Sequence, residues 1–509
     1  MARGGEALLV RGGTIVAIGP LASVRALARR GTARVDLGGG TLLPGFTDAH
    51  LHLITWIRAL QEPWLQSQDV ASIERAVRER VAARPGAEWL KARGWVPRDW
   101  GADRRSRATL DRIAPERPLV LHAVDGHSVW ANRVALELAG IGARTPDPPG
   151  GRVERDSLGE PTGALIEEAA KLLRPFITQD STPREDLARA IGRARSLGLT
   201  SAHDFDRALT WRPAQELERE GRLGFRLLLT IPIDALDAAA ELGLEAGFGG
   251  ARLRIGPVKI FADGTLGSAT ALLEEPYEDR ADRGVEVVGP AELAHACVRA
   301  ARAGLTVAIH AIGDCAVRNA LDAIEAAGRE GLAFALPPRV EHVQLARTED
   351  FPRFRALGAI ASVQPVHLLT DRDVARQFWG DRCERSYPWK SLLRSGARLM
   401  FGSDAPFDRA GPLRALQAAV LRGDGADARP FHPEQRLTLA QALQAHLEEP
   451  HRAAGWARLG RLSPGWGADL VHFDQNLLES PPDEWHRGQV LGTWIEGARV
   501  HGRALPGER

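Results

Sequence analysis

The alternation of short apolar runs with helical segments is the feature that most restricts the fold of this chain. From about residue 198 onward, runs rich in β-branched residues alternate with Ala/Leu/Arg/Glu-rich segments of helical period. This pattern is typical of βα units around a parallel sheet. The stretch TLLPGFTDAHLH at 41–52 adds one more strand to seven later ones. Those seven lie at 198–205, 225–232, 254–264, 305–313, 339–345, 359–369 and 398–407.

Eight parallel strands with helices between them predict a (β/α)8 TIM barrel, an α/β fold whose chemistry lies at the carboxyl ends of the strands. We predict this barrel over residues 44–461. The segment at about 60–190 is too long for a simple βα loop, so we predict an insertion after strand 1, near the active site. Within it, Asn132 and Gly140 are expected to begin and end a helix.

Both ends of the chain carry strand signals outside the barrel. The segment ALLVR-GG-TIVAIG predicts a two-stranded hairpin, and GADLVHFD and VLGTWIEGARVHG near the other end are also strand-like. We therefore predict that residues 1–43 and 462–509 form one small composite β domain, a β-sandwich built from both termini.

The composition argues against several classes of function. With 44% hydrophobic residues, 26% charged residues and a net charge of +1, the chain has no signature of disorder, a nucleic-acid surface or a membrane partner. A small-molecule substrate is the expected partner, and a homodimer is the default assembly. The N-terminal segment lacks the apolar core of a signal peptide, and the three cysteines form no CxxC pair. We expect a soluble, cytoplasmic protein.

Polar residues late in the apolar runs predict a metal site. In His50-Leu51-His52, residues i and i+2 of a strand point to the same face, which is a chelating arrangement. An isolated HxH pair is also compatible with packed or surface histidines. His310, His342 and Asp404 follow other strands, and singly they could be two core histidines and a helix cap.

Together, however, four histidines and one carboxylate around one rim indicate a divalent metal. Imidazole and carboxylate without thiolate suit zinc first, with iron, manganese, nickel or cobalt as alternatives.

Lys259 is unusual because only four of the 66 basic residues are lysines. It lies in the apolar run GPVKIFADG, where a dry site favours the neutral amine. A neutral amine can take up CO2 and become a carbamate, whose two oxygens can bridge two metal ions, whereas arginine stays protonated. The alternative is an ion pair between Lys259 and the nearby Asp263.

These residues resemble the ligand set of the binuclear-metal branch of the amidohydrolase superfamily. Longer motifs are similar to the YtcJ-like, or amidohydrolase-3, group, which includes N-substituted formamide deformylases. They are HSVWANRVALELAGI (127–141), TPDPPGGRVERDSLGEPTGALIEEA (145–169), GPVKIFADGTLGSATA, HAIGDCAV (310–317) and RVEHVQL. Members of the group usually begin with an additional strand pair, so either the small domain is trimmed here or the true start lies upstream.

The resemblance implies a role for each metal-site residue. His50, His52 and Asp404 would hold one zinc ion, His310 and His342 a second, and carboxylated Lys259 would bridge the two. A hydroxide shared by two metals would attack the substrate carbonyl. Asp404 would pass a proton to the leaving amine. The products would be a carboxylic acid and an amine.

The expected activity is therefore that of a metal-dependent amidohydrolase cleaving a non-peptide C–N bond of an N-acyl or N-formyl amine. The alternatives are an ester, lactone or carbamate hydrolase in the same site, and a barrel protein that binds without catalysis. Six further residues are candidates for contacts to substrate or to the metal ligands, and the alternative for each is structural hydrogen bonding. They are Asp125, His127, Asp204, Asp263, Gln364 and His367.

Overall fold

A computed structural model describes most of the chain and divides it into two compact units. The described residues are 6–83, 88–96, 99–100, 106–124, 126, 128–177, 179, 181–425 and 429–503. One unit combines Met1–Ile54 with Pro183–Arg509, and the other is Thr55–Thr182. Among the described residues, every helix is too short or too polar to serve as a membrane span.

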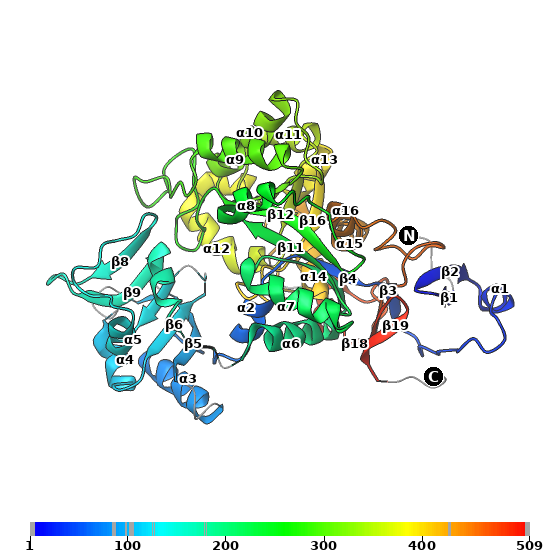
Figure 1. The fold of residues 1–509 in the computed structure, drawn as a ribbon, viewed down its shortest axis with the longest axis horizontal. Coiled ribbons are helices and arrows are strands. Elements are labelled where there is room, and N and C mark those ends of the chain that lie inside the picture. Colours follow the sequence, from blue (N-terminus) through cyan, green and yellow to red (C-terminus); the bar gives the residue numbers. More distant parts are fainter. Residues whose placement is uncertain are drawn as a thin grey trace. The chain divides into compact units, whose positions relative to one another are not determined.

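The larger unit is built around eight parallel strands, as the sequence predicted. Their spatial order is β16-β15-β14-β13-β12-β11-β10-β4, a nearly closed barrel (Figure 1). Most of their residues are buried, as expected for a parallel sheet that is covered on both faces. The strands are β4 (Phe46–Leu51), β10 (Leu199–Asp204), β11 (Arg226–Pro232), β12 (Leu253–Phe261), β13 (Val307–Ala311), β14 (Arg339–His342), β15 (Ile360–Val363) and β16 (Arg398–Phe401).

Backbone hydrogen bonds join the first barrel strand to the segment after the last one. The amide of Asp404 donates to the carbonyl of His50 at 2.7 Å, and the amide of His52 donates to the carbonyl of Ala405 at 3.1 Å. Residues 354 positions apart in the sequence are thereby held side by side, because barrel closure brings the two edges of the sheet together.

Helices surround the strands of this unit (Figure 1). The longer helices bury an apolar stripe; in α10, for example, Val317, Leu321 and Ile324 are buried at spacings of four and three residues. The helices are α6 (Pro183–Ser196), α7 (Ala208–Arg219), α8 (Leu236–Glu241), α9 (Pro290–Arg302), α10 (Asp314–Arg329), α11 (Phe351–Ala356), α12 (His367–Trp379), α13 (Trp389–Arg394), α14 (Pro412–Leu421), α15 (Leu439–Leu447) and α16 (Glu449–Ala453); α1 (Leu21–Ala26) lies near the N-terminus.

The segment 41–52 is not one strand, and in this respect the prediction was wrong. It divides at Gly45 into β3 (Thr41–Pro44), which pairs with β17 (Leu470–Phe473), and the barrel strand β4. A Cβ atom at Gly45 would lie 2.2 Å from the side chain of Thr200 on the neighbouring strand β10. The chain can therefore pass between the two sheets only where it has no side chain.

Strands from both ends of the chain lie side by side (Figure 1). The predicted hairpin is present as β1 (Ala7–Arg11) and β2 (Thr14–Gly19). A four-stranded antiparallel sheet has the order β19-β18-β17-β3, with β18 at Val490–Ile495 and β19 at Ala498–Gly502. The composite β domain, with its boundaries at 1–43 and 462–509, stays a prediction.

The smaller unit has its own five-stranded sheet, in the order β5-β6-β7-β9-β8. The expected helix is present, because the side chain of Asn132 accepts a hydrogen bond from the amide of Ala135 and caps the helix. The elements are α3 (Val70–Ala83), β5 (Leu90–Trp95), α4 (Arg107–Ile113), β6 (Leu119–Ala123), β7 (Ser128–Ala131), α5 (Arg133–Leu138), β8 (Gly151–Arg155) and β9 (Pro161–Glu167), and α2 (Leu53–Ala59) crosses the boundary between the units.

Candidate metal centre

The side chains predicted as metal ligands come from the ends of five barrel strands. His50 lies on β4 and His52 just after it, while Lys259 is on β12 and His310 on β13. His342 is the last residue of β14, and Asp404 follows β16. Because the strands are parallel, these ends meet at the same edge of the barrel.

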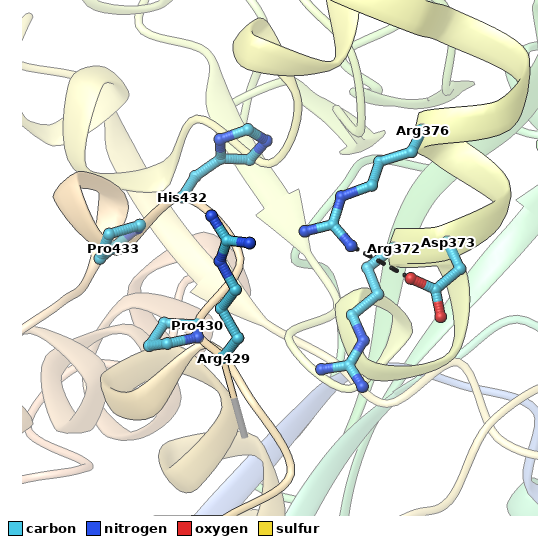
Figure 2. Close-up of a pocket in the computed structure, with 7 residues that line it drawn as sticks. All are labelled: Arg372, Asp373, Arg376, Arg429, Pro430, His432 and Pro433. Atoms are coloured by element: carbon cyan, nitrogen blue, oxygen red, sulfur yellow. Dashed lines mark hydrogen bonds and ion pairs between the residues drawn. The ribbon is translucent and has the colours of Figure 1, made fainter. Parts of the chain in front are cut away.

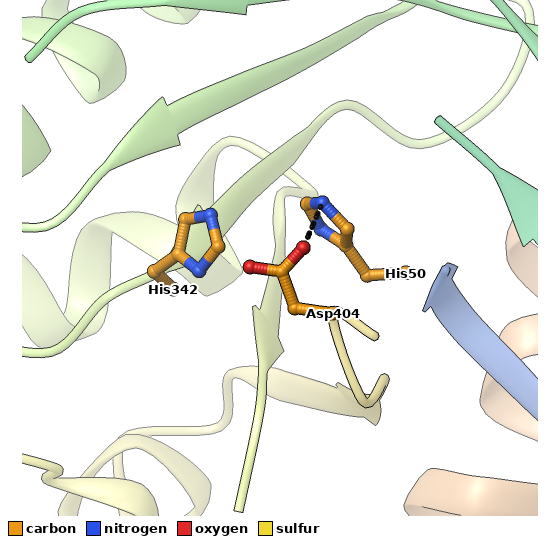
Figure 3. A group of neighbouring side chains, drawn as sticks. All are labelled: His50, His342 and Asp404. Atoms are coloured by element: carbon orange, nitrogen blue, oxygen red, sulfur yellow. Dashed lines mark ion pairs between the residues drawn. The ribbon is translucent and has the colours of Figure 1, made fainter. Parts of the chain in front are cut away.

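His50, His342 and Asp404 form the tightest group of ligand atoms. One potential donor atom from each of the three lies within 4.8 Å of the others, and all three residues are buried (Figure 3). His50 Nε2 is 3.4 Å from Asp404 Oδ1. The backbone of His342 has a φ of 77° and that of Asp404 a φ of 58°, in the left-handed region that residues with a side chain rarely adopt. Such strain is often found at functional sites.

His52 joins this group through the same carboxylate. Its Nε2 lies 3.2 Å from Asp404 Oδ1, and its Nδ1 lies 3.7 Å from Asp206 Oδ1. Burial opposes protonation of His52, but contacts with Asp206 and Asp404 outweigh it and raise its pKa to about 9. In this arrangement the protonated His52 ring places a positive charge next to Asp404. A bound metal cation would take over the role of this charge.

His310 lies on the other side of His342, with the two ring centroids 4.4 Å apart. Its Nε2 donates to the backbone carbonyl of Gly264 at 2.9 Å and lies 3.6 Å from Asp263 Oδ1. Asp263, a candidate for substrate contact, instead accepts hydrogen bonds from the amides of Leu272 and Gly313 at 2.9 Å each. Asp263 therefore stabilises the loop that contains Gly264, whose carbonyl accepts the hydrogen bond from His310.

Lys259 is buried among aromatic rings. Its Nζ lies 4.6 Å from the ring centroid of Phe261 and 4.9 Å from that of Phe205. Burial lowers its pKa to about 8, although Glu341 and Asp404 act in the opposite direction. The carboxylates that act most strongly on the Lys259 amine are Glu341 and Asp404, whereas Asp263 lies 3.6 Å from His310 Nε2.

The second ring nitrogen of His50 is held by a buried carboxylate that the sequence analysis missed. His50 Nδ1 is 2.8 Å from Glu341 Oε2, and Glu341 Oε1 is 3.2 Å from Nε of Arg339. Arg339 in turn donates to Nδ1 of His203 at 2.7 Å, and all these side chains are buried. Glu341 directly precedes His342, and neighbouring residues of a strand point to opposite faces. The sequence pattern therefore did not predict that both side chains lie at the site.

His342 is oriented by a residue that was predicted. Its Nδ1 is 2.9 Å from Oε1 of Gln364, which leaves Nε2 available. The ring of His367 is stacked parallel to that of His342 at 6.0 Å, and His367 Nε2 lies 3.8 Å from Asp404 Oδ2. Gln344, which the sequence analysis missed, lies 3.4 Å from His367 Nδ1.

Of the three remaining candidates for substrate contact, only Asp204 is among the described residues. Asp204 is buried and accepts a hydrogen bond from the amide of Leu53 at 3.0 Å, and burial raises its pKa to about 7. Asp206 lies two residues after Asp204 and contacts His52. Because residues i and i+2 of an extended segment point to the same side, the position of Asp206 relative to Asp204 could have indicated that it also faces the site. Asp125 and His127 lie outside the described residues.

The donor set fits a divalent cation. Burial is the main reason that the pKa of His50 falls to about 4 and that the pKa of His342 lies well below its usual range, so both rings are neutral and keep a lone pair. Burial opposes ionisation of Asp404, but His50 and the other nearby imidazoles outweigh it and hold the pKa of this carboxyl well below its usual range. Asp404 Oδ1 lies 3.4 Å from His50 Nε2 and 3.2 Å from His52 Nε2, so a cation bound here would meet an anionic oxygen and two imidazoles together.

Comparison with known proteins gives one family match and several relatives that cover most of the chain. The sequence profile of the Amidohydrolase family matches residues 33–501. The protein LONG AFTER FAR-RED 3 of Arabidopsis thaliana is 34% identical over 520 residues, covering 97% of this chain and 88% of the relative. The N-substituted formamide deformylase of Arthrobacter pascens is 30% identical over 517 residues, covering 97% and 94%. A solved structure of an uncharacterized metal-dependent hydrolase from Pyrococcus horikoshii superposes with a TM-score of 0.77 at 28% identity, covering 97% of this chain and 95% of the other.

Proposed function

Because the chain belongs to the amidohydrolase family, we propose that it hydrolyses an N-acyl or N-formyl amine at the metal centre described above. The family and the similarity to metal-dependent hydrolases identify it as a hydrolase acting on C–N bonds other than peptide bonds. The relative from Arthrobacter pascens, described as an N-substituted formamide deformylase, supports the narrower substrate class. The observation that carries the proposal is the buried group of His50, His342 and Asp404.

We assign the ligands to two zinc ions. His50, His52 and Asp404 would hold one ion, and His310 and His342 the other. The contacts of His50 and His342 support this assignment, because one nitrogen of each ring is engaged by Glu341 or Gln364, which orients the other nitrogen toward a metal.

The assignment of Lys259 as a carbamate that bridges the two ions has its own support. In the reaction, the neutral amine forms a bond to the carbon of CO2 and releases one proton. The burial that lowers the pKa of Lys259 to about 8 increases the fraction of neutral amine at physiological pH. Phe205 and Phe261, which flank Nζ, keep this position dry.

The protein side chains would provide the proton transfers. When bound, divalent metal supplies an activated water at neutral pH and polarises the substrate carbonyl. Asp404 is ionised and lies where the ligand set converges, so its carboxylate can accept the proton of the attacking water and deliver it to the leaving amine. His367 Nε2 lies 3.8 Å from Asp404 Oδ2, close enough for an electrostatic contact with this carboxylate.

A substrate screen tests the proposal. Purified protein reconstituted with zinc would be assayed with N-formyl and N-acyl amines, aryl esters and lactones, with release of the amine, phenol or ring-opened acid as the readout. We expect turnover of the amides, and a loss of that turnover in Asp404→Asn. Ester or lactone turnover without turnover of any amide would contradict the proposed substrate class.

A further inference from the structure

A basic cavity lies in the barrel unit between α12 and the segment 429–433. Its volume is about 610 Å³. The side chains that line it include three guanidinium groups, one imidazole and one carboxylate (Figure 2). They belong to Arg372, Asp373, Arg376, Arg429, Pro430, His432 and Pro433. The metal centre and the proposed hydrolysis do not use any of them.

The positive charges of this cavity are poorly compensated. Arg376 pairs with Asp373 at 3.1 Å, but the two side chains are 52% and 79% exposed, and such surface pairs contribute little free energy. Arg372 is 3.8 Å from Asp424, a carboxylate that it shares with an arginine on α14. Arg429 has no ion pair with any of the described residues. With His432 neutral, the lining has a net charge of +2.

The cationic groups are also held in position. The guanidinium groups of Arg376 and Arg429 point toward one another from α12 and from the opposite wall (Figure 2). Arg376 lies over the buried ring of Phe431, 5.0 Å from its centroid, and the His432 ring packs against the same phenylalanine at 4.1 Å. His432 Nδ1 lies 3.7 Å from Glu434 Oε1. Two guanidinium groups that face one another favour an anionic ligand between them.

We propose that this cavity binds a small organic phosphate, with its phosphoryl group between Arg376 and Arg429. Guanidinium groups match phosphate oxygens in a bidentate geometry. One carboxylate would be satisfied by a single guanidinium group, whereas the two charges of a phosphate monoester would use both Arg376 and Arg429. The cavity is much larger than a phosphate ion, and Pro430 and Pro433 offer apolar surface to an organic part.

The basic cavity is separate from the metal centre, but one helix, α12, contributes residues to both. α12 begins at His367, which contacts Asp404. At a rise of about 1.5 Å per residue, Arg372 and Arg376 lie roughly 7.5 and 13.5 Å further along the helix axis. The proposal does not depend on the reaction at the metal centre, so its test can be made by binding alone.

Isothermal titration at constant ionic strength tests the proposal with phenyl phosphate, inorganic phosphate and benzoate. We expect phenyl phosphate to bind more tightly than inorganic phosphate, and benzoate to bind at least ten-fold more weakly than phenyl phosphate. The double variant Arg376→Gln/Arg429→Gln should lose at least ten-fold in affinity for phenyl phosphate. Arg302→Gln, which removes an exposed arginine paired with Glu330 on the barrel surface, is the matched control and should bind as the unchanged protein does.

Phosphate can also bind to a metal, so each titration is repeated after metal removal with a chelator. Binding that disappears with the metal and ignores the two arginine substitutions belongs to the metal centre and overturns the proposal. Equal affinity for benzoate and phenyl phosphate overturns the choice of phosphate. Should the double variant unfold, as judged by circular dichroism, the single change at the exposed Arg429 should still weaken binding at least three-fold, and unchanged affinity there overturns the proposal.

Discussion

Replacing Glu341 with glutamine tests whether the buried chain behind His50 prepares the metal centre. The carboxylate bridges His50 Nδ1 at 2.8 Å and Arg339 Nε at 3.2 Å. Glutamine has the same shape but no charge, so Arg339 would lose its buried counterion and the His50 ring would keep only an uncharged, weaker hydrogen-bond acceptor. Partners of this kind usually contribute 10- to 100-fold to metal affinity, or about 1.4–2.8 kcal/mol.

The same substitution should also lower the stability of the metal-free protein. Removing one partner of a buried ion pair typically costs about 3–5 kcal/mol, because the other charge stays buried without compensation. We expect a smaller loss here, since the amide oxygen of glutamine can still accept a hydrogen bond from His50. Urea unfolding of metal-free protein measures this effect separately from metal binding.

Zinc affinity would be measured by competition with a chromophoric chelator, for the unchanged protein and for Glu341→Gln. Glu330→Gln, which removes a carboxylate from an exposed ion pair with Arg302, is the control and should bind zinc normally. A zinc affinity within two-fold of the unchanged protein, in a folded Glu341→Gln variant, would refute the reasoning that Glu341 prepares His50 for the metal.

Three further predictions follow from the described contacts. Lys259→Ala and Lys259→Arg should both reduce the metal content from about two equivalents per chain, as measured by plasma mass spectrometry, and unchanged content in both would exclude a bridging role. Asp404→Asn should lower kcat for amide hydrolysis by about 10²–10⁴-fold with unchanged circular dichroism, whereas near-normal turnover would remove Asp404 from the proton transfers. Burial opposes ionisation of Glu341, but Arg339 and His50 outweigh it and lower its pKa from 4.5 to about 2. Its stabilising effect is therefore complete above pH 4.5 and is lost as the pH falls toward 2, so acid unfolding in this range should be less steep in Glu341→Gln.

The grouping of His50, His342 and Asp404 at one edge of the barrel could be predicted from the sequence because its signals are local. An i, i+2 pair such as His50 and His52 shares a face of any strand, and residues at the ends of parallel strands meet at one edge of the barrel without further information. His342 and Asp404 were predicted from their positions at the ends of such strands. Lys259 stood out because it is a rare lysine in an apolar run.

The groups that support those ligands depended on the tertiary structure. Glu341 contacts His50 across 291 positions of sequence, and it lies beside His342 although strand alternation would turn it away. The left-handed backbone of His342 interrupts this alternation at the strand end. The division of the first strand at Gly45 likewise follows from the close approach of Thr200 on the next barrel strand.

The basic cavity illustrates the same limit. Arg372 and Arg376 have the spacing of one helix face, but Arg429 and His432 reach them from a segment more than 50 residues away. Sequence periodicity determines which face of a strand or helix is buried, and thus the barrel and its ligand edge. Which distant side chains meet across those faces is determined only by the packing of the complete fold, because such contacts leave no periodic signal in the sequence.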